Sequence, residues 1–490
     1  AGLKDIQLTL TAKLSDGTRG LDAKATPFSS DAVLGTVSAD LTTGTDGKLD
    51  QLKAQLKGPS FARMIAAIGA TASVKDDAEL SLQATLKRRE GGGLQVDGEL
   101  STQHIGVNWW RLAPRPIDDF SVSAKARFEV TQSPALIRFD ASELKLGEAK
   151  SAVLFEFVDL QPGRATAHLK LTVPSQDCGT IASSIPTSML PTIGPIEATG
   201  ELGLSFDLTI PLHKPYGGKL DADLSDEECV IDKFGNVDVH ELAKPFSRPV
   251  NESGTILEDQ LIGPKSNAWV DLASLSPWVP YAMIATEDAA FYHHRGVRLG
   301  LLGRAIKMCF DHGRFVYGGS TITQQLIKNI YLTREKNLAR KFEELLIVWH
   351  IERSLLDNKK NLKDEDRYVA TKDRLLELYI NGIEYGPSLY GITRASREYF
   401  DKEPTELSPL EATFLAANKP CPKCGHKRFT TRKWTPWWQE RMVSIMSKMR
   451  RDGIITDDEF SAEAPYVPRF RGWPGSARKQ PGSAIGGVEE

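Results

Sequence analysis

Polar and apolar residues alternate along most of the first half of the chain. Segments such as ELSLQATLKR (79–88), DDFSVSAKARFEV (118–130) and ATAHLKLTV (165–173) place apolar residues at about every second position, and Gly, Pro or Asp turns separate such segments. A period of two is the side-chain repeat of a β-strand. The pattern predicts an antiparallel β-rich domain over residues 1–232, as either a sandwich or a curved sheet. Residues 60–70 and 178–185 instead have the composition of short helices.

The alternation stops at Lys233. Residues 233–266 are polar and contain Pro and Gly, which predicts a linker or a small connecting lobe. From Trp269 apolar residues recur every three or four positions, so residues 267–468 are expected to form a mostly α-helical domain that ends in a helical hairpin. The Gly-, Pro- and Ser-rich tail, residues 469–490, is expected to be disordered. The predicted fold class is therefore α+β and multidomain.

Composition narrows the function classes. A chain of 490 residues is too long for one hydrophobic core. A net charge of −3 argues against a nucleic-acid partner, which needs a basic face, and five cysteines are too few for a small disulfide scaffold. No run approaches the roughly 18 apolar residues of a transmembrane helix, and no signal peptide is visible. Because the chain starts at Ala1 rather than Met, we expect any membrane anchor to be a segment absent from it.

The first cluster with candidate chemistry is ATEDAAFYHHRGV, residues 285–297. Glu287, Phe291 and His294 are four and three residues apart, so a continuous helix would bring them near one face. The apolar run WVPYAMIA just before them would bury the start of that helix, and a carboxylate at the edge of such a run can serve as a general base. The alternative is a solvated Glu287–Asp288 pair on a helix surface.

The second cluster is GGSTITQQLIKN, residues 318–329. Ser320 and Thr321 are good N-cap types, and Thr321 with Gln324 fits a capping box. The spacing predicts that one helix face presents Thr321, Gln324, Gln325 and Lys328 together. Glycines beside a helix N-terminus also suit an anionic ligand. An amphipathic helix with a polar outer face is the alternative.

The third cluster is ARKFEE, residues 339–344. Arg340 and Lys341 lie four and three residues before Glu344, so the carboxylate can pair with both cations on a helix. Taken alone, such pairs are usually weak surface contacts.

Together and in this order, the clusters resemble the first three signature motifs of the bacterial peptidoglycan glycosyltransferases, the family 51 enzymes: E-D-x-x-F-x-x-H-x-G, G-x-S-T-I-T-Q-Q-L-x-K-N and R-K-x-x-E. Two later segments also resemble family motifs, KDRLLELYINGIEYG with Lys372, Glu377, Tyr379 and Asn381, and RASREYFDK with Arg394, Tyr399, Phe400 and Lys402. The resemblance spans about Leu272 to Ala464 and leaves out the first two hundred residues. It implies a mostly α, lysozyme-like domain.

The resemblance also implies a reaction. Enzymes of this family polymerise lipid II, joining its GlcNAc 4-hydroxyl to MurNAc C1 of the growing chain with inversion and release of undecaprenyl pyrophosphate. Glu287 would be the general base. Lys328, Arg340 and Lys341 would stabilise the departing pyrophosphate. Glu344, the second catalytic residue, would orient these cations or help hold a divalent metal, Mg²⁺ or Mn²⁺.

Two further groups of residues carry over from the family. The donor site would be lined by Ser320, Thr321, Gln324, Gln325 and Asn329, and the residues that support the site would be Asp288, Phe291, His294, Glu377 and Asn381. The implied partners are lipid II, the nascent glycan strand and the membrane surface, with envelope proteins bound through the β-rich domain. The implied location is the periplasmic face of the bacterial inner membrane.

The sequence departs from the family pattern in places. Arg298 stands in a neighbourhood where an acid is usual. LGLLGRAIKMCF (299–310) matches a region that dips into the bilayer in the family, and its apolar residues with Arg304 and Lys307 suit either an interfacial segment or core packing. No transpeptidase follows; Ser476 and Lys479 fit S-x-x-K in the tail, and we regard that match as accidental.

The cysteines leave alternatives open. Cys421, Cys424 and His426 resemble part of a zinc site, but no second ligand pair is evident, and a disulfide or free thiols are favoured. Cys178 and Cys229 could pair in an oxidising periplasm.

Two other functions compete with lipid II polymerisation. One is a non-catalytic scaffold that binds glycan or envelope partners, and the other is a lysozyme-like hydrolase. A scaffold has no need for Glu287, Lys328, Arg340 and Glu344 together. Glycan hydrolysis has no pyrophosphate leaving group for such cations to meet.

Overall fold

A computed structural model gives the conformation of most of the chain. It describes residues 6–15, 18–27, 35–43, 49–58, 74–89, 93–108, 112–132, 135–161, 163–214, 217–225, 229–252, 255–264, 266–298, 319–333, 335, 337–355 and 363–473, with the backbone alone up to residue 80. The chain forms two compact units. Among the described residues, the first unit holds those up to 238 with 319 and 333–344, and the second holds 239–298, 320–332 and 345–473.

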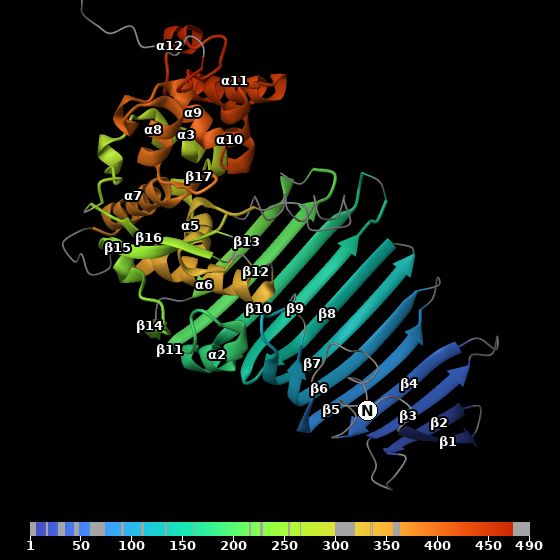
Figure 1. The fold of residues 1–490 in the computed structure, drawn as a ribbon. Coiled ribbons are helices and arrows are strands. Elements are labelled where there is room, and N and C mark those ends of the chain that lie inside the picture. Colours follow the sequence, from blue (N-terminus) through green and yellow to red (C-terminus); the bar gives the residue numbers. More distant parts are fainter. Residues whose placement is uncertain are drawn as a thin grey trace, which may run out of the picture. The chain divides into compact units, whose positions relative to one another are not determined.

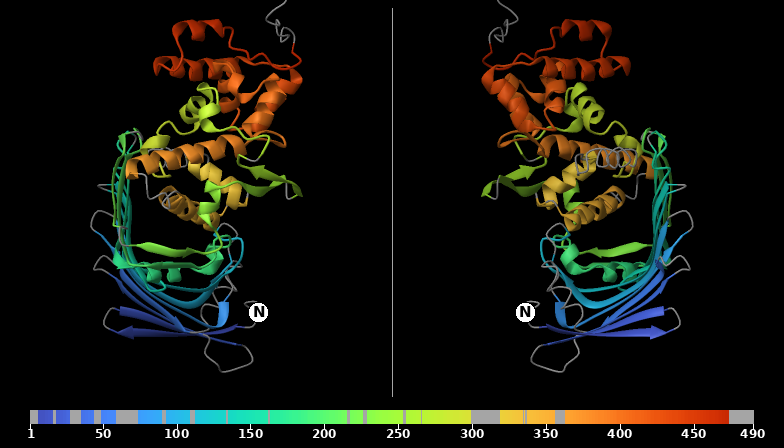
Figure 2. Two further views of the ribbon diagram at one scale, coloured as in Figure 1. Left: turned by 90° about the vertical axis from the view of Figure 1, so that its left-hand side faces the viewer. Right: turned by 90° about the vertical axis from the view of Figure 1, so that its right-hand side faces the viewer.

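The first unit is built on one antiparallel sheet of twelve strands, in which β1 to β10 follow chain order and β12 and β13 complete the edge (Figure 1). The strands are β1 Ile6–Ser15, β2 Thr18–Pro27, β3 Gly35–Thr43, β4 Leu49–Gly58, β5 Val74–Arg88, β6 Leu94–Val107, β7 Ile117–Gln132, β8 Ala135–Leu146, β9 Ala149–Val158, β10 Thr166–Asp177, β12 Glu201–Pro211 and β13 Lys219–Ser225. Figure 2 shows that this sheet is curved. The predicted β-rich domain is confirmed, as one curved sheet rather than a sandwich.

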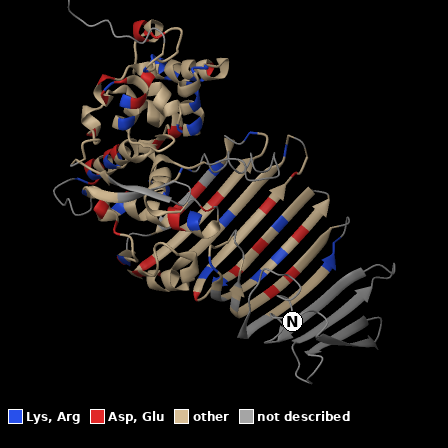
Figure 3. Cartoon of the chain, in the orientation of Figure 1, with Lys and Arg blue, Asp and Glu red and all other residues tan. Residues whose placement is uncertain are grey.

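Strand register explains the alternating pattern. Apolar residues are direct partners across seven consecutive strands of the sheet, from Leu86 through Val96, Phe128, Phe139, Phe155 and Leu169 to Leu208. The neighbouring row holds Asp97, Arg127 and Asp140. Because successive side chains point to opposite faces, one face of the sheet is apolar and the other is charged. Figure 3 shows the charged residues recurring along these strands.

The charged face contains a hydrogen-bonded network around His168. Its Nδ1 lies 3.0 Å from Oε1 of Glu156 and its Nε2 lies 2.8 Å from Oδ1 of Asp207, while Arg138 donates to Glu156 at 2.7 Å. Burial lowers the pKa of His168, but the hydrogen bonds to Glu156 and Asp207 outweigh burial, and the net shift is upward. The imidazolium is therefore favoured in the folded unit.

We expect His168 to make the stability of the first unit, which we call the sheet unit, depend on pH. Because folding raises the pKa of His168, the free energy that this residue contributes to stability is fully present below its ordinary pKa of about 6.5. That free energy is lost as the pH rises through the folded-state pKa. The difference between the wild type and His168→Asn in the free energy of unfolding of the sheet unit, measured by amide exchange in β10 and β12, should therefore shrink as the pH rises from about 5.5 to 9. His213→Asn, at an exposed position, is the control. A difference that stays constant across this range would contradict the assignment.

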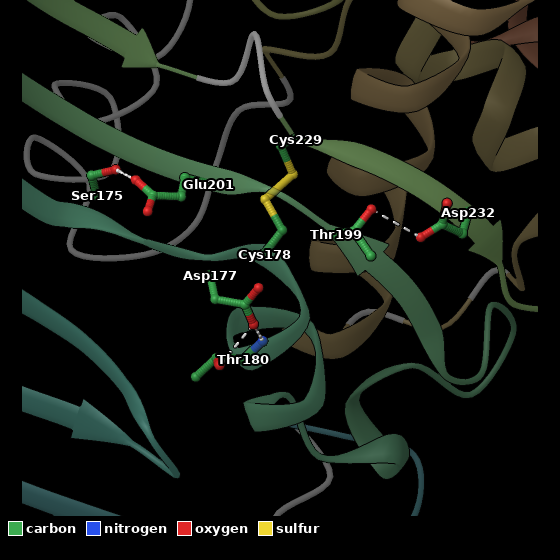
Figure 4. Close-up of a disulfide and its surroundings, with 8 residues drawn as sticks. All are labelled: Ser175, Asp177, Cys178, Thr180, Thr199, Glu201, Cys229 and Asp232. Carbon is green, nitrogen blue, oxygen red and sulfur yellow. Dashed lines mark hydrogen bonds between the residues drawn. A yellow bond between two sulfur atoms is a disulfide. The ribbon is translucent and has the colours of Figure 1, made fainter.

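A small subdomain follows β10 in the same unit. It contains α2 Cys178–Ser184, the 3-10 turn η3 Thr187–Met189, and β11 Ile196–Thr199 paired with β14 Val230–Phe234. Asp177 caps α2 by accepting a hydrogen bond from the Thr180 amide at 2.7 Å. A disulfide joins Cys178 to Cys229 (Figure 4). The helix predicted over 178–185 is confirmed, whereas the one predicted over 60–70 lies outside the described residues.

The second unit is mostly α-helical, as predicted. Its elements are η5 Val239–Ala243, β15 Phe246–Glu252, β16 Thr255–Ile262, η6 Leu272–Ser274, α3 Trp278–Glu287, η7 Phe291–His293, α5 Ile322–Tyr331, α7 Asp364–Gly382, β17 Glu384–Gly386, β18 Leu389–Tyr390, α8 Ile392–Phe400, η8 Pro404–Glu406, α9 Pro409–Ala417, α10 Pro422–Thr431, α11 Pro436–Arg451 and α12 Asp457–Ala462. Helix α6, Leu338–Ser354, begins in the first unit and continues in the second. Residues 233–266 include η5 and the β15–β16 hairpin. None of the helices in the described ranges is long and apolar enough to cross a membrane.

The beginning of the C-terminal tail corrects one prediction. Phe470 is fully buried and stacks on Phe400 with ring centroids 5.7 Å apart, and the Arg471 amide donates to the Tyr399 carbonyl at 2.7 Å. Disorder from residue 469 is therefore wrong for 469–473, because an aromatic side chain completes the core there. Residues 474–490, with Ser476 and Lys479, lie outside the described residues.

Candidate active site

Glu287 lies at a helix end rather than on a continuing helix. Helix α3 ends at Glu287, Asp288 has φ −158° and ψ 71°, and the chain then forms the short turn η7. The prediction that Glu287, Phe291 and His294 share one helix face is therefore wrong. The helix ends there because the Asp288 carboxylate binds His294 and the Ile322 amide, which both lie outside α3.

Asp288 joins the first motif to the second. Its buried carboxylate lies 2.9 Å from Nε2 of His294 and accepts a hydrogen bond of 3.3 Å from the Ile322 amide at the start of α5. Phe291 is fully buried, with the ammonium of Lys372 4.6 Å from its ring centroid. These three predicted supporting residues shape the turn that follows Glu287.

The N-terminus of α5 has the predicted capping box. The Thr321 hydroxyl accepts a hydrogen bond from the Gln324 amide, and the Gln324 side chain accepts one from the Thr321 amide at 2.9 Å. Thr321 also donates to the Gly296 carbonyl at 2.6 Å. Both side chains are buried. The predicted shared polar face is therefore wrong for Thr321 and Gln324, because the cap engages their polar atoms.

Gln325 contacts Glu287 directly. Its Nε2 donates to Oε2 of Glu287 at 2.8 Å, and its Oε1 accepts a hydrogen bond from the Tyr379 hydroxyl at 3.0 Å. The Tyr379 hydroxyl thus orients the amide so that its N–H faces the carboxylate. Lys328 lies one helical turn beyond Gln325 and is exposed, as is Asn329. The structure thus brings Glu287 to the helix that carries a predicted pyrophosphate-binding cation.

Glycine is required at position 296. Its φ is +81°, and a Cβ there would lie 2.3 Å from Cγ1 of Val348 and 3.1 Å from Cγ of Glu352. This close approach lets the turn after His294 pack on α6 and present its carbonyl to Thr321. The neighbouring Arg298 is half-buried, and the segment 299–310 lies outside the described residues.

The third motif lies on the first turns of α6. Arg340 pairs through Nη1 with Oε2 of Glu344 at 2.8 Å, and Lys341 pairs with Oε1 of the same carboxylate. Glu344 is 1% exposed, whereas the side chains of Arg340 and Lys341 are 16% and 40% exposed. Two cations around one carboxylate leave a net positive charge that suits a phosphate group. Glu344 therefore holds the two cations in place.

The donor set does not fit a metal at Glu344. Each of its oxygens already faces a cation, whereas Mg²⁺ and Mn²⁺ sites use carboxylate oxygens that are free to coordinate. In the described parts of the chain, no three His, Cys, Asp or Glu side chains come together as metal ligands. Cys421 and Cys424 form a disulfide at the start of α10, which was one of the alternatives for this pair.

Helix α7 supports the site through its remaining motif residues. Glu377 accepts hydrogen bonds from the Leu272 amide at 2.9 Å and from Arg374 at 2.7 Å. The Asn381 side chain bonds both to the amide of Val270, at 3.1 Å, and to its carbonyl, at 2.9 Å. These contacts tie α7 to the segment that leads into α3.

The sequence reasoning missed Glu352. This residue of α6 is fully buried as a side chain, pairs with Lys372 at 2.7 Å and accepts a hydrogen bond from the Thr323 hydroxyl at 2.6 Å. The available signal was a glutamate within the apolar stretch LLIVWHIERSL, because a charge among buried positions needs a partner. Ser320, predicted to line the donor site, is half-buried just before the helix cap.

Comparison with known proteins shows what the helical part of the chain is similar to. A family model described as transglycosylase matches residues 254–450. The chain is 38% identical over 165 residues to the biosynthetic peptidoglycan transglycosylase of Cupriavidus metallidurans, covering 34% of this chain and 64% of that protein. It is 35% identical over 204 residues to penicillin-binding protein 1A of Aquifex aeolicus, covering 41% of this chain and 25% of that protein. It is 39% identical over 190 residues to penicillin-binding protein 1F of Bacillus subtilis, covering 39% and 24%.

The matches define the extent of the likeness. The chain spans between about a quarter and two thirds of the length of these three relatives, from 24% to 64%. The family match includes Glu287, Gln325, Lys328, Arg340 and Glu344, and leaves out the twelve-stranded sheet. Residues 254–450 are therefore a transglycosylase domain of the peptidoglycan glycosyltransferase family, as the signature motifs predict.

Proposed function

We propose that this chain polymerises lipid II into glycan strands, with inversion at MurNAc C1 and release of undecaprenyl pyrophosphate. The observation that carries the proposal is the hydrogen bond from Gln325 to Glu287, which joins two motifs 38 residues apart. A neutral amide donor fixes the orientation of a carboxylate and does not itself neutralise the negative charge. That is the arrangement a general base needs.

In the proposed reaction Glu287 works through its second oxygen. Oε2 accepts the hydrogen bond from Gln325. Oε1 takes the proton of the acceptor 4-hydroxyl while the hydroxyl oxygen attacks C1. The C1–O bond to the pyrophosphate breaks, and the leaving group keeps the electron pair. The orientation of Glu287 rests on Gln325 and Tyr379, so both belong to the supporting structure of the base.

The cations would serve the leaving group. Negative charge grows on the pyrophosphate as the C1–O bond breaks, and preorganised cations stabilise such charge more in the transition state than in the ground state. Lys328 on α5 and the two cations on α6, Arg340 and Lys341, would supply the positive charge. Glu344 keeps Arg340 and Lys341 in a defined geometry. No step requires a metal bound at Glu344.

The proposed substrates place the protein at a membrane. Lipid II and the growing strand are both lipid-linked, so the membrane surface is a proposed partner. The resemblance to the family adds the periplasmic face of the bacterial inner membrane as the proposed site of action. We also propose that envelope proteins bind to the sheet unit.

Turnover of labelled lipid II in detergent tests the function. We expect the wild type to produce a ladder of glycan strands and to release undecaprenyl pyrophosphate. Binding without turnover would instead support a scaffold, and shortening of a preformed glycan would support a hydrolase. The control is Glu440→Gln, at an exposed position on α11, which should polymerise like the wild type.

A further inference from the structure

The start of α6 is attached to the sheet unit. The amide of Ala339 donates to the carbonyl of Leu112 at 2.8 Å. The Ala339 side chain is fully buried in a small apolar cluster with Ala113 and Ile117, beside the start of β7. Because residues 333–344 belong to the same compact unit as the sheet, these contacts lie within that unit.

Glu343 makes the second attachment. Its Oε1 accepts hydrogen bonds from two consecutive backbone amides, those of Thr192 at 2.6 Å and Ile193 at 2.9 Å. Glu343 is 1% exposed and Ile193 is fully buried. Burial raises the pKa of Glu343, and the amide donors act in the opposite direction. A buried carboxylate that receives two backbone N–H groups fixes both the loop and the helix turn.

The attached face and the cationic face of α6 are different. Ala339 and Glu343 are four residues apart and therefore lie on one side of the helix. Arg340 and Glu344, also four apart, lie about 100° further around it. The Asn337 side chain caps this turn by accepting a hydrogen bond from the Arg340 amide at 2.8 Å. Attachment through one face therefore sets the direction of the other.

We propose that the sheet unit positions the cations at the start of α6, Arg340 and Lys341, and that Glu343 is the positioning residue through which it acts. The loop that holds Thr192 and Ile193 sets the rotation of α6, and with it the directions of Arg340 and Lys341. This inference rests on the proposed function, in which these two cations meet the pyrophosphate. It gives the sheet a role inside the catalytic cycle, in addition to any binding of envelope partners.

The test compares three substitutions of Glu343 in the full chain. Glu343→Ala removes the acceptor, Glu343→Asp keeps the charge but shortens its reach, and Glu343→Gln keeps an acceptor oxygen of the same reach. Glu440→Ala, on the exposed side of α11, is the control. Amide hydrogen exchange is measured over residues 187–193 and 338–344, with α7 and α9 as reference helices, and lipid II polymerisation is measured on the same samples.

We expect faster exchange in both segments for Glu343→Ala, with α7 and α9 unchanged. The same variant should lose kcat/KM for lipid II by on the order of ten- to a hundred-fold, because small displacements of a charge-stabilising group are costly. Glu343→Asp should show a smaller loss of the same kind. Glu343→Gln should stay within roughly three-fold of the wild type, since it keeps both hydrogen bonds. If Glu343→Ala also loses protection in α7 and α9, its structure has changed beyond the attachment. Exchange at 187–193 and kcat/KM are then compared between the wild type and Glu343→Asp.

Two results would overturn the inference. One is unchanged exchange at 187–193 in the Ala and Asp variants, which would mean that Glu343 does not hold the loop. The other is faster exchange there with wild-type kcat and KM, which would mean that the attachment has no effect on catalysis. A wild type that does not polymerise lipid II would refute the proposed function, whereas the exchange result would still report on the attachment.

Discussion

Glu287→Gln is expected to abolish lipid II polymerisation, with a rate loss of about 10²- to 10⁴-fold, the contribution typical of a general base. The substitution preserves the size of the side chain. Its amide oxygen can still accept the hydrogen bond that Gln325 donates to Glu287 at 2.8 Å, so the end of α3 should keep its conformation. An amide does not accept a proton at neutral pH, and the acceptor hydroxyl therefore stays un-ionised as it approaches C1.

The measurement is the initial rate of glycan formation from labelled lipid II, together with lipid II binding by the inactive variant. Binding should be retained, because the cations on α5 and α6 are untouched. Glu440→Gln makes the same chemical change at an exposed position and should leave the rate as it is. If Glu287→Gln keeps a rate within about ten-fold of the wild type, the assignment of Glu287 as base is wrong.

Local chemistry was the part of the site that the sequence predicted well. The Thr321–Gln324 capping box involves residues three apart and depends only on the helix that contains them. The pairing of Arg340 and Lys341 with Glu344 is also local. Both could be predicted because their geometry follows from the helix repeat.

Contacts between distant segments could not be predicted from spacing. Helical periodicity continues through Asp288 in the sequence, but the helix stops there because His294 and the Ile322 amide bind its carboxylate. The same holds for Glu343, whose partners Thr192 and Ile193 lie about 150 residues earlier. In the sequence it looks like one more acid in the FEE triplet.

The sheet shows a similar division. Period-two alternation predicts strands and their two faces, and the register between Val96, Phe128 and Phe139 confirms it. The alternation does not determine whether the apolar face meets a second sheet or belongs to one curved sheet, because both give the same pattern. The observed single sheet depends on strand pairing from β1 to β13.

Lys372→Met is expected to destabilise the second unit by about 3–5 kcal/mol, the usual cost of removing one partner from a buried ion pair. The side chains of Lys372 and Glu352 are both fully buried, 2.7 Å apart. Without the ammonium, the Glu352 carboxylate keeps the Thr323 hydroxyl as a donor but loses its counter-charge. Methionine suits the space over the Phe291 ring, so a cavity is not the cause of the loss.

Amide exchange in α7 reports this local free energy better than a single melting temperature, because the chain has two units. Glu352→Gln alone should cost less than Lys372→Met, because burial already lowers the pKa of Lys372 and the lysine can release its proton. In the double variant both charges are gone and the amide oxygen introduced by Glu352→Gln can still accept from Thr323, so protection should recover toward the wild type. A double variant less stable than Lys372→Met would show that packing, rather than the unpaired carboxylate, determines the loss.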